Sequence, residues 1–266
     1  MPRSLTQRFG IGNMQEKSLL KVVALVLSIG LLAGCASTPA AKSEDPGDPM
    51  EGMNRSFYNF NDAIDRNVLE PVARGYVKVT PDPVRAGVTR FFGNVNYINV
   101  IANDLLQGKL GQFASDTGRF VVNSTVGVGG IFDPATHMGM PEHDEDLGQT
   151  IGSYGAGEGA YLVLPLIGPN SVRDVPNLGS ALLLNPLTYL NAIVTVPLGV
   201  VAAVNTRANL LEASSIRDQA ALDPYTFVRE AYRQQREFKI YDGNPPGDGF
   251  EEYVEDESDA AILKIY

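Results

Sequence analysis

Two histidines, the residues most often used in acid–base catalysis and metal binding, lie in one short segment. They are His137 and His143, and His143 stands between Glu142 and Asp144 in the run DPATHMGMPEHDEDLG. Carboxylates beside an imidazole could hold a metal ion, but this spacing fits neither a helical HExxH motif nor a D-x-D-x-D-G calcium loop. We interpret the run as a solvated acidic loop and predict no metal site there.

The motifs of common catalytic and nucleotide-binding sites are missing from the sequence. No G-x-S-x-G string is present, so the chain lacks the nucleophile elbow of α/β-hydrolase lipases. Gly152, Gly155, Gly157 and Gly159 form a glycine-rich run, yet no Lys-Ser or Lys-Thr follows it and Rossmann spacing is absent. We therefore predict a non-enzymatic protein without a cofactor, in which this run provides flexibility or close packing.

The single cysteine, Cys35, has the surroundings of a lipid-attachment site. A flank with four basic residues precedes the apolar run 22–32, which leads into the string Leu-Ala-Gly-Cys. That string resembles the lipobox of bacterial lipoproteins, which implies cleavage before Cys35 and its acylation. An ordinary membrane anchor is the alternative, but the run has about half of the ~20 residues that a span needs. We predict a signal peptide over residues 1–34, with translation starting at either Met1 or Met14.

The charge of the mature chain excludes one class of partner. Residues 1–34 carry four basic residues and one acidic residue, so their removal changes the formal net charge from -10 to -13. An acidic chain with scattered basic residues is a poor electrostatic match to nucleic acid. We predict no nucleic-acid binding, and we expect any contact with an anionic lipid surface to be apolar.

Composition divides the mature chain into three parts. Residues 35–47 are small, polar and proline-bearing, which is typical of a flexible tether. Residues 48–241 carry helical periodicity, and we expect them to form one domain. Residues 242–266 begin with a strongly acidic stretch that contains two adjacent prolines, which indicates a disordered tail or, less simply, an acidic docking arm.

Hydrophobic spacing predicts a mainly α-helical fold. Asp48-Pro49 and Asp223-Pro224 are typical helix starts, in which the aspartate caps the first turn. A helix opened by Asp82 is expected to end at Gly93, and a second helix over 94–107 is expected to end at Gly108. A period-two pattern, typical of a strand, appears only briefly around Ala160 to Leu166.

The most unusual stretch is almost free of charge. Across residues 159–206 the charged residues are the neighbours Arg173 and Asp174, and Val175 to Thr206 has none. A soluble helical protein normally places charges on each exposed face. The stretch could be the centre of a soluble core or a membrane span, but its prolines and asparagines interrupt a clean span. We favour helices that lie in, or are partly inserted into, one membrane leaflet.

Longer strings resemble the MlaA/VacJ family of outer-membrane lipoproteins. The matching strings run in consistent order from about Asp48 to Tyr241, and they are DPMEGMNR, YNFN, VLEPVARGY, PVRAGVTRFFGN, GVGGIFDPA, EDLGQTIGSYGAGEGAYLVLPLIGPNSVRD and DPYTFVREAY. Two features depart from the family: many members have tryptophans at the membrane interface, whereas this chain has none, and its acidic tail has no evident match.

The resemblance implies a fold and a function. It implies an all-helical, ring-like disc seated in the inner leaflet of the outer membrane of a Gram-negative bacterium, with a polar channel through it and a hairpin-like loop near residues 152–168. Such proteins remove mislocalised phospholipid from the outer leaflet, bind a porin trimer and pass lipid to a soluble periplasmic shuttle. Ala36 and Ser37 follow Cys35, with no Asp at the second position, and by resemblance to enterobacterial lipoproteins this favours the outer membrane. The alternative is a structural lipoprotein that binds porin without handling lipid.

The resemblance also suggests which residues handle lipid. Polar residues of the helices would line the lipid path, and the glycine-rich run with the strand after it would form a gating loop. For the path these are Asn59, Phe60, Asn61 and Asn103. For the gating loop they are Gly152, Gly155, Gly157, Tyr161, Leu164 and Pro165.

Overall fold

The computed structural model describes residues 45–246. The predicted signal peptide, Cys35, most of the predicted tether and residues 247–266 of the predicted tail lie outside the described residues.

The described chain is mainly α-helical with one small β-hairpin, as the sequence predicted. In chain order the helices and strands are α2 (Glu51–Ile64), the π-helix η2 (Asp65–Leu69), α3 (Glu70–Val79), α4 (Asp82–Gln107), α5 (Leu110–Thr125), α6 (Pro134–His137), α7 (Leu147–Ser153), β1 (Tyr161–Leu164), β2 (Gly168–Ser171), α8 (Val175–Leu184), the 3₁₀-helix η3 (Pro186–Tyr189), α9 (Ala192–Asn209), α10 (Leu211–Ala220) and α11 (Pro224–Ile240).

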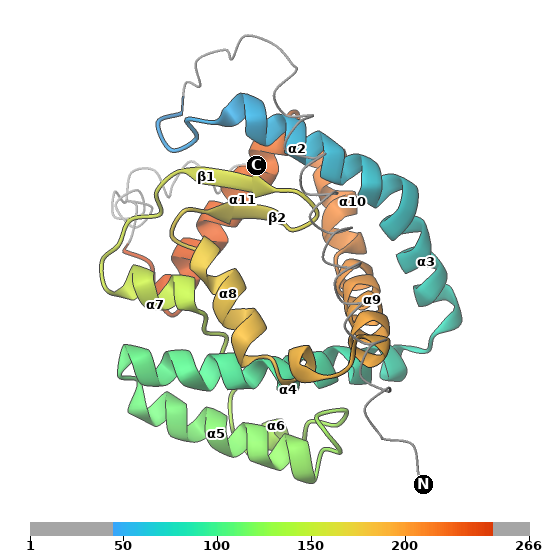
Figure 1. Cartoon of the computed structure of the whole chain (residues 1–266), viewed down its shortest axis with the longest axis vertical. Coiled ribbons are helices and arrows are strands. Elements are labelled where there is room, and N and C mark those ends of the chain that lie inside the picture. The colour runs from blue at the N-terminus through green and yellow to red at the C-terminus, as the bar shows by residue number, and fades with distance from the viewer. Residues whose placement is uncertain (1–44, 247–266) are drawn as a thin grey trace, which may run out of the picture.

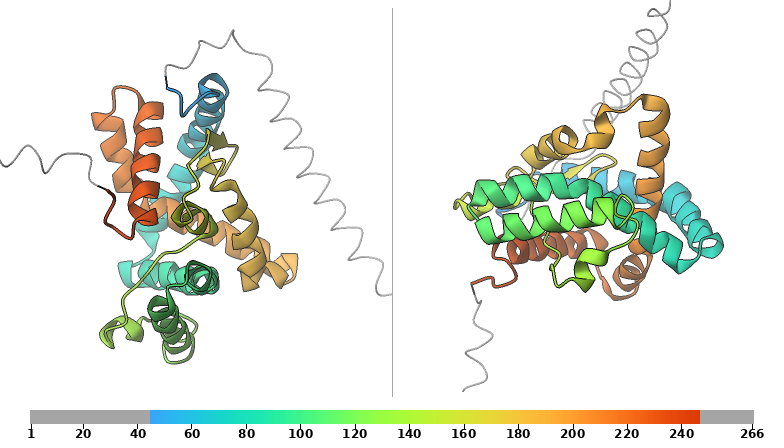
Figure 2. Two further views of the ribbon diagram at one scale, coloured as in Figure 1. Left: turned by 90° about the vertical axis from the view of Figure 1, so that its left-hand side faces the viewer. Right: turned by 90° about the horizontal axis from the view of Figure 1, so that it is seen from below.

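These elements close into a ring (Figure 1). Starting from α2, the ring continues through α3, then α9, which contacts both α3 and α4, and then α7 and α8, which contact α4. The hairpin completes the circuit, because β1 contacts α2 and β2 contacts α11. Helix α5 lies against α4 outside the ring, and Figure 2 shows these two helices side by side.

Helix ends follow the predicted local chemistry in some places and not in others. Gly108 ends α4 with a left-handed φ of 74°, and Asp223 caps α11 by accepting from the Tyr225 amide. The cap predicted at Asp48 is wrong, because α2 begins at Glu51 and the Asp48 side chain accepts from the side chains of Asn54 in α2 and Arg229 in α11. The break predicted at Gly93 is also wrong, since α4 continues through it. Packing of α4 against α5 and α9 outweighs the low helix propensity of one glycine.

A π-helical segment lies within the long helix that forms one side of the ring. Residues 51–79 are helical throughout, with η2 between α2 and α3. Segments of this kind insert an extra residue into a helix and often mark functional positions. Here Asp65 of η2 and Glu70 of α3 both bind Arg207 of α9, at 2.6 and 3.3 Å. The π-helical segment therefore helps to place the carboxylates of Asp65 and Glu70 against the guanidinium of Arg207. Arg207 is the first charged residue after the uncharged stretch.

The hairpin has a simple antiparallel register. Tyr161 pairs with Ser171 and Leu164 pairs with Gly168, so the turn occupies residues 165–167. Leu166 adopts a left-handed φ of 64° and Gly168 a φ of 96°. The hairpin begins later in the sequence than the loop predicted near 152–168. Residues 152 and 153 still belong to α7, and the first strand begins at Tyr161.

Asparagines satisfy the backbone at the breaks of the uncharged stretch. Asn185 accepts from the Leu187 amide at 2.9 Å and begins η3, and Asn191 accepts from the Ile193 amide at 3.0 Å and begins α9. Asn205, buried near the other end of α9, donates to Thr89 of α4. By length and composition α9 is apolar enough to cross a membrane. Broken helices of this kind are tolerated in lipid where side chains satisfy the freed backbone groups.

Candidate functional site

The distribution of polar and apolar side chains is the reverse of that in a soluble protein. Among residues 45–246, eight hydrophobic residues are buried, whereas nineteen polar or charged residues are. The buried charges include Asp48, Asp116, Arg119 and Asp174, all at most 5% exposed. Charged side chains are the ones least often found fully buried in folded proteins. A protein that buries ionic groups and exposes apolar ones is suited to an apolar surrounding.

The exposed apolar side chains are concentrated in the uncharged stretch. Helices α8 and η3 contain no buried residue. Several large side chains on α8, η3 and α9 are more than half exposed, namely Leu182, Leu183, Tyr189, Ile193, Val196 and Val200. We call residues 175–206 the apolar belt. The alternative of a buried soluble core is wrong for this stretch, because its side chains face outward.

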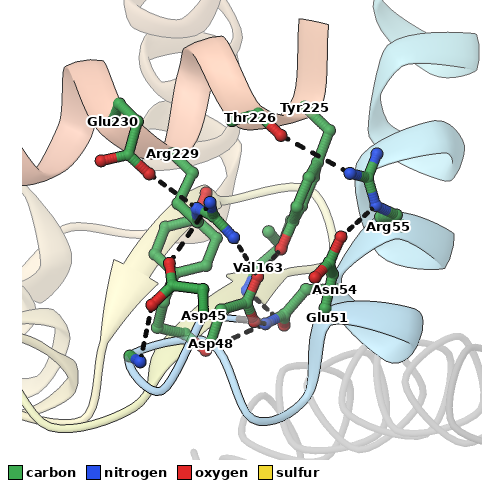
Figure 3. A network of polar contacts seen from close by, with 12 residues as sticks. Asp45, Asp48, Glu51, Asn54, Arg55, Val163, Tyr225, Thr226, Arg229 and Glu230 are labelled. Atoms are coloured by element: carbon green, nitrogen blue, oxygen red, sulfur yellow. Dashed lines mark hydrogen bonds and ion pairs between the residues drawn. The ribbon is translucent and has the colours of Figure 1, made fainter. Parts of the chain in front are cut away.

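Two buried networks join the ends of the ring. In the first, Asp48 binds Arg229 of α11 at 3.1 Å, accepts from the Tyr225 hydroxyl and accepts from Asn54 of α2 at 2.7 Å (Figure 3). Asp45 bonds Arg233 at 2.6 Å and so holds the end of the predicted tether on α11. The bonds from Arg233 and Gly47 outweigh partial burial and lower the pKa of Asp45.

The second network uses the isolated acidic residue of the uncharged stretch. Asp174 binds Arg236 at 2.9 Å and accepts from the Tyr232 hydroxyl, and Arg236 also binds Asp146 at 2.6 Å. Burial alone would raise the pKa of Asp174, but the bonds from Tyr232 and Arg236 outweigh it and lower that pKa. Helices α7 and α11 and the start of α8 are thereby joined through one guanidinium.

Asparagines of α2 satisfy the open edge of β1. Asn54 donates to the Tyr161 carbonyl and accepts from the Val163 amide, both at 2.9 Å. Two turns further along the same helix, Asn61 donates to the Leu164 carbonyl at 2.9 Å and accepts from the Leu166 amide at 2.8 Å. The carboxamides therefore replace the hydrogen bonds of a neighbouring strand. Asn61 attaches the turn of the hairpin to α2.

A pocket of about 390 Å³ lies between α2, the hairpin, α10 and α11. Apolar side chains such as Val163, Phe227 and Val228 line most of it, and the Asp65–Arg207 pair and Asn61 line its polar part. The pocket combines an apolar wall with a guanidinium, which is the combination that an amphipathic lipid requires. It is our candidate for part of the lipid path.

The predicted path residues occupy different surroundings. Asn61 lines this pocket, whereas Asn59 and Phe60 are exposed on α2, Phe60 by 45%. Asn103 is buried between α4 and α7, where its side-chain oxygen accepts from the Thr150 hydroxyl at 2.8 Å. The structure therefore does not bring the four together.

The glycines of the predicted gating loop have three distinct roles. Gly152 lies in α7, and a Cβ there would come within 2.8 Å of Ile240, so it allows close packing against α11. Gly155 has a left-handed φ of 88° with open space around it, and Gly157 has open space as well. The freedom needed for a hinge is thus found at residues 155–157 rather than at 152.

The strand residues of that loop differ in burial. Tyr161 is fully buried against Tyr225 and Tyr232, while Leu164 and Pro165 are partly exposed. Burial raises the pKa of Tyr161. Tyr161 is therefore an anchor of the hairpin, and the exposed apolar side chains Leu166 and Ile167 form its tip.

The acidic loop is folded against the outer helices. The His143 ring bonds to Asp116 of α5 at 2.9 Å, and Glu145 binds Lys109 at 2.7 Å. Within residues 45–246, no group of three or more side chains from His, Cys, Asp or Glu is arranged to hold a metal ion. The acidic loop thus packs against the outer helices through His143 and Glu145, while Glu142 and Asp144 are exposed, as the predicted solvated loop requires.

A buried carboxyl pair gives this region a pH dependence. Burial and the adjacent carboxylate of Asp116, with Glu145 contributing less, raise the pKa of Asp104 to about 7. The folded protein therefore binds a proton that the unfolded chain has lost above pH ~4, so stability falls as pH rises from about 4 to about 7.

We expect Asp104→Asn to abolish most of the loss of stability between pH ~4 and ~7, because a neutral amide needs no proton. The thermal midpoint of the variant in detergent should exceed that of the parent at pH 8 and differ little at pH 5. Asp82→Asn, at a position with an 88% exposed side chain on the same helix, is the matched control and should have little effect at either pH. Equal pH slopes in parent and Asp104→Asn would contradict the assignment.

Sequence reasoning missed the residues that close the ring. Asn54 lies in the matching string DPMEGMNR, but nothing local marks it as a partner of a strand edge, and Arg207 and Arg236 belong to no matching string. One signal was present, because the neighbours Arg173 and Asp174 are the charged residues of an otherwise uncharged stretch and Arg207 is the first charge after it. A charge retained at the border of an apolar segment indicates a specific buried partner.

Comparison with known proteins agrees with this architecture. The model of the family described as MlaA lipoprotein matches residues 46–239. The intermembrane phospholipid transport system lipoprotein MlaA of Shigella flexneri is 36% identical over 224 residues, covering 82% of this chain and 88% of that protein. Its counterpart in Escherichia coli strain K12 is 35% identical with the same coverage.

A solved structure is also similar. It comes from work on the structural basis for maintenance of bacterial outer membrane lipid asymmetry, and it matches with a TM-score of 0.65 and 32% identity. The match covers 73% of this chain and 98% of the other. The sequence match over almost the whole described region and the shared ring of helices together show that this chain belongs to the MlaA lipoprotein family.

Proposed function

We propose that this protein is a non-enzymatic lipoprotein that removes mislocalised phospholipid from the outer leaflet of the outer membrane. In this proposal it passes the lipid to a soluble periplasmic shuttle, which makes it part of retrograde phospholipid transport and the maintenance of lipid asymmetry. The observation that carries the proposal is the reversed burial. Buried ion pairs join the ring, and the apolar belt faces outward.

The reversed burial also supports a position in the membrane. Helices α8, η3 and α9 offer no charge to water, so their outward faces are favourable in hydrocarbon and unfavourable in the periplasm. The mature chain is acidic, and its charges lie outside the apolar belt. We propose that the ring sits in the inner leaflet, with the belt in the acyl chains and α11 toward the periplasm. A porin trimer is proposed as the membrane partner.

The proposed lipid path uses the amphipathic pocket beside the hairpin. Asn61 and the Asp65–Arg207 pair would meet the headgroup, and Val163 and Phe227 the acyl chains. The hairpin would gate the path by moving about residues 155–157, where backbone freedom is greatest. Asn59, Phe60 and Asn103 remain proposed path residues, and Leu164 and Pro165 remain proposed gate residues.

Lipid analysis of the purified protein tests the function directly. Mature protein extracted in a mild detergent is expected to carry phospholipid in a stoichiometric amount after extensive washing. A porin-binding lipoprotein without lipid handling would carry none above the level of an unrelated acylated protein. Release of fatty acid from added phospholipid would contradict the non-enzymatic assignment.

The proposed anchor makes its own prediction. Cys35→Ala removes the thiol that is acylated before signal cleavage, so the variant should accumulate as an unprocessed precursor. The expected readout is a larger band on a gel and loss of metabolically incorporated palmitate. Cys35→Ser is the conservative control and should behave in the same way. Mature protein of normal size in the outer membrane would contradict lipidation at Cys35.

A further inference from the structure

Three hollows adjoin along α4, where the segment 126–133 crosses the helix. The crossing is close, because a Cβ on Gly130 would lie 2.3 Å from Cβ of Asn94. The first hollow has a volume of about 470 Å³, the second about 480 Å³ and the third about 170 Å³. Phe132 lines the first and second, and Arg90 and Asp133 line the second and third, so the three form one continuous surface.

The first hollow is an apolar groove between α4 and α9. Its walls are Val84, Val88 and Phe91 of α4, Leu198 and Val201 of α9, and Phe132. Val84, Val201 and Phe132 are all more than 40% exposed, so the groove is open. It continues into the apolar belt through α9. Its volume lies in the range of pockets that hold small apolar ligands.

The other two hollows are polar, and they contain an uncompensated cation. Arg90 is exposed on α4, and within residues 45–246 it has no ion pair or side-chain hydrogen bond. The neighbouring carboxylate is already engaged, since Asp133 accepts from Arg119 at 2.6 Å and from Asn123 at 3.0 Å. Burial opposes ionisation of Asp133, but hydrogen bonds from Thr136, Asn123 and Arg119 lower its pKa to about 2. Glu142 approaches Arg119, at 3.7 Å, and is 71% exposed.

The third hollow also contains polar atoms without partners. Arg119 is 3% exposed and Asn94 is 6% exposed. Among the described residues, the Arg119 Nε atom and the Asn94 Oδ1 atom lack a hydrogen-bond partner. Buried polar atoms of this kind are normally satisfied, so their presence indicates a ligand or water that fills the hollow. The Arg119 Nε donor beside the Arg90 guanidinium suits a phosphate group, whereas the Asn94 Oδ1 acceptor suits a water or a donor of the headgroup.

We propose that these hollows form a binding site for one phospholipid on the wall of the ring, with the phosphate at Arg90 and an acyl chain in the groove between α4 and α9. An apolar groove that ends at an unpaired cation complements an amphiphile with a phosphate group and fits neither a free sugar nor a neutral oil. The site rests on the proposed function for the identity of its ligand. It places a lipid between the surrounding leaflet and the ring, apart from the pocket beside the hairpin.

Fluorescence quenching tests the site. Because the chain has no tryptophan, Phe132→Trp creates a single reporter where the groove meets the polar hollow. Phosphatidylethanolamine with brominated acyl chains, added to the full-length mature protein in detergent, should quench this reporter and reach saturation. Arg90→Gln in the same background should raise the lipid concentration for half-quenching about tenfold, because a charge-assisted contact to phosphate is lost.

Matched variants separate a site from general lipid exposure. Tyr189→Trp replaces a 73% exposed aromatic residue of the apolar belt. Quenching of this tryptophan should rise with the lipid fraction without saturation. Adding Arg90→Gln should not change that curve. Arg74→Gln, on the exposed surface of α3, should leave the Phe132→Trp curve unchanged. Brominated diacylglycerol, which lacks phosphate, should bind the Phe132→Trp protein as weakly as the phospholipid binds the Arg90→Gln variant.

Two results would overturn the proposal. One is quenching of Phe132→Trp that rises linearly with lipid fraction, as at position 189. The other is an Arg90→Gln curve that coincides with its parent. Full displacement by millimolar inorganic phosphate would show that the site takes free phosphate. Lipid asymmetry in cells is measured separately, so failure of this site can be distinguished from failure of the transport function.

Discussion

Asn54→Ala is expected to destabilise the folded ring more than any other single change on α2. The variant leaves the Val163 amide and the Tyr161 carbonyl without partners, and it removes a donor from the fully buried Asp48. Unsatisfied buried groups cost about 1–3 kcal/mol each, so we expect a loss of about 3–5 kcal/mol. In a chain of this size the thermal midpoint in detergent should fall by roughly 10 °C.

Asn59→Ala provides the matched control for that prediction. It removes the same side chain from the same helix at an exposed position. Its effect should stay within about 0.5 kcal/mol. Equal losses from the two variants would show that the asparagine–strand contacts do not hold the hairpin.

Attaching the hairpin covalently to α2 is expected to stop lipid movement. The Asn61 side chain already bonds the Leu166 amide, so cysteines introduced by Asn61→Cys and Leu166→Cys would lie within reach of a short thiol crosslinker that is cleaved by reduction. If the hairpin gates the path, the crosslinked protein should transfer no lipid and regain transfer on reduction. Association with the membrane should be unchanged, because the apolar belt lies elsewhere in the ring.

The two single-cysteine variants are the controls for this experiment. They lose the Asn61 contacts or alter the tip without joining the elements, so the crosslinker should not change their transfer rates. Transfer at the parental rate by a fully crosslinked protein would contradict a moving hairpin. The path would then have to be open at all times.

The sequence predicted the helices and the outward-facing stretch because both depend on local patterns. Helical spacing and the cap at Asp223 need only neighbouring residues, and 32 consecutive residues without charge, Val175 to Thr206, have no polar face to offer water. The predicted break at Gly93 was wrong because tertiary contacts with α5 and α9 continue the helix. The cost of a glycine within a helix is only about 1 kcal/mol.

The closing contacts of the ring could not be predicted in the same way. Asn54 and Val163 are 109 positions apart, and Asp48 and Arg229 are 181 apart. An asparagine that completes a strand edge has the same local sequence as one exposed to water, as Asn59 shows. Gly152 was assigned to a gating loop by the family resemblance, whereas its packing against Ile240 depends on where α11 lies.

The buried ion pairs give the ring a particular sensitivity. Arg236 and Arg229 are each 8% exposed and each bind carboxylates from other elements. Removal of one partner from such a pair leaves an uncompensated charge, which is far costlier than the pair is stabilising. The closed shape therefore depends on a few residues of α11, although the helix itself is short of buried apolar side chains.

The central claim is that this protein keeps phospholipid out of the outer leaflet. The most direct measurement is the phospholipid exposed on the surface of intact cells, labelled by a membrane-impermeant amine reagent. Cells without the protein should expose phosphatidylethanolamine at the surface, and the parental chain should restore the low level while the crosslinked Asn61→Cys, Leu166→Cys protein should not. An unchanged surface level in cells that lack the protein would contradict the account.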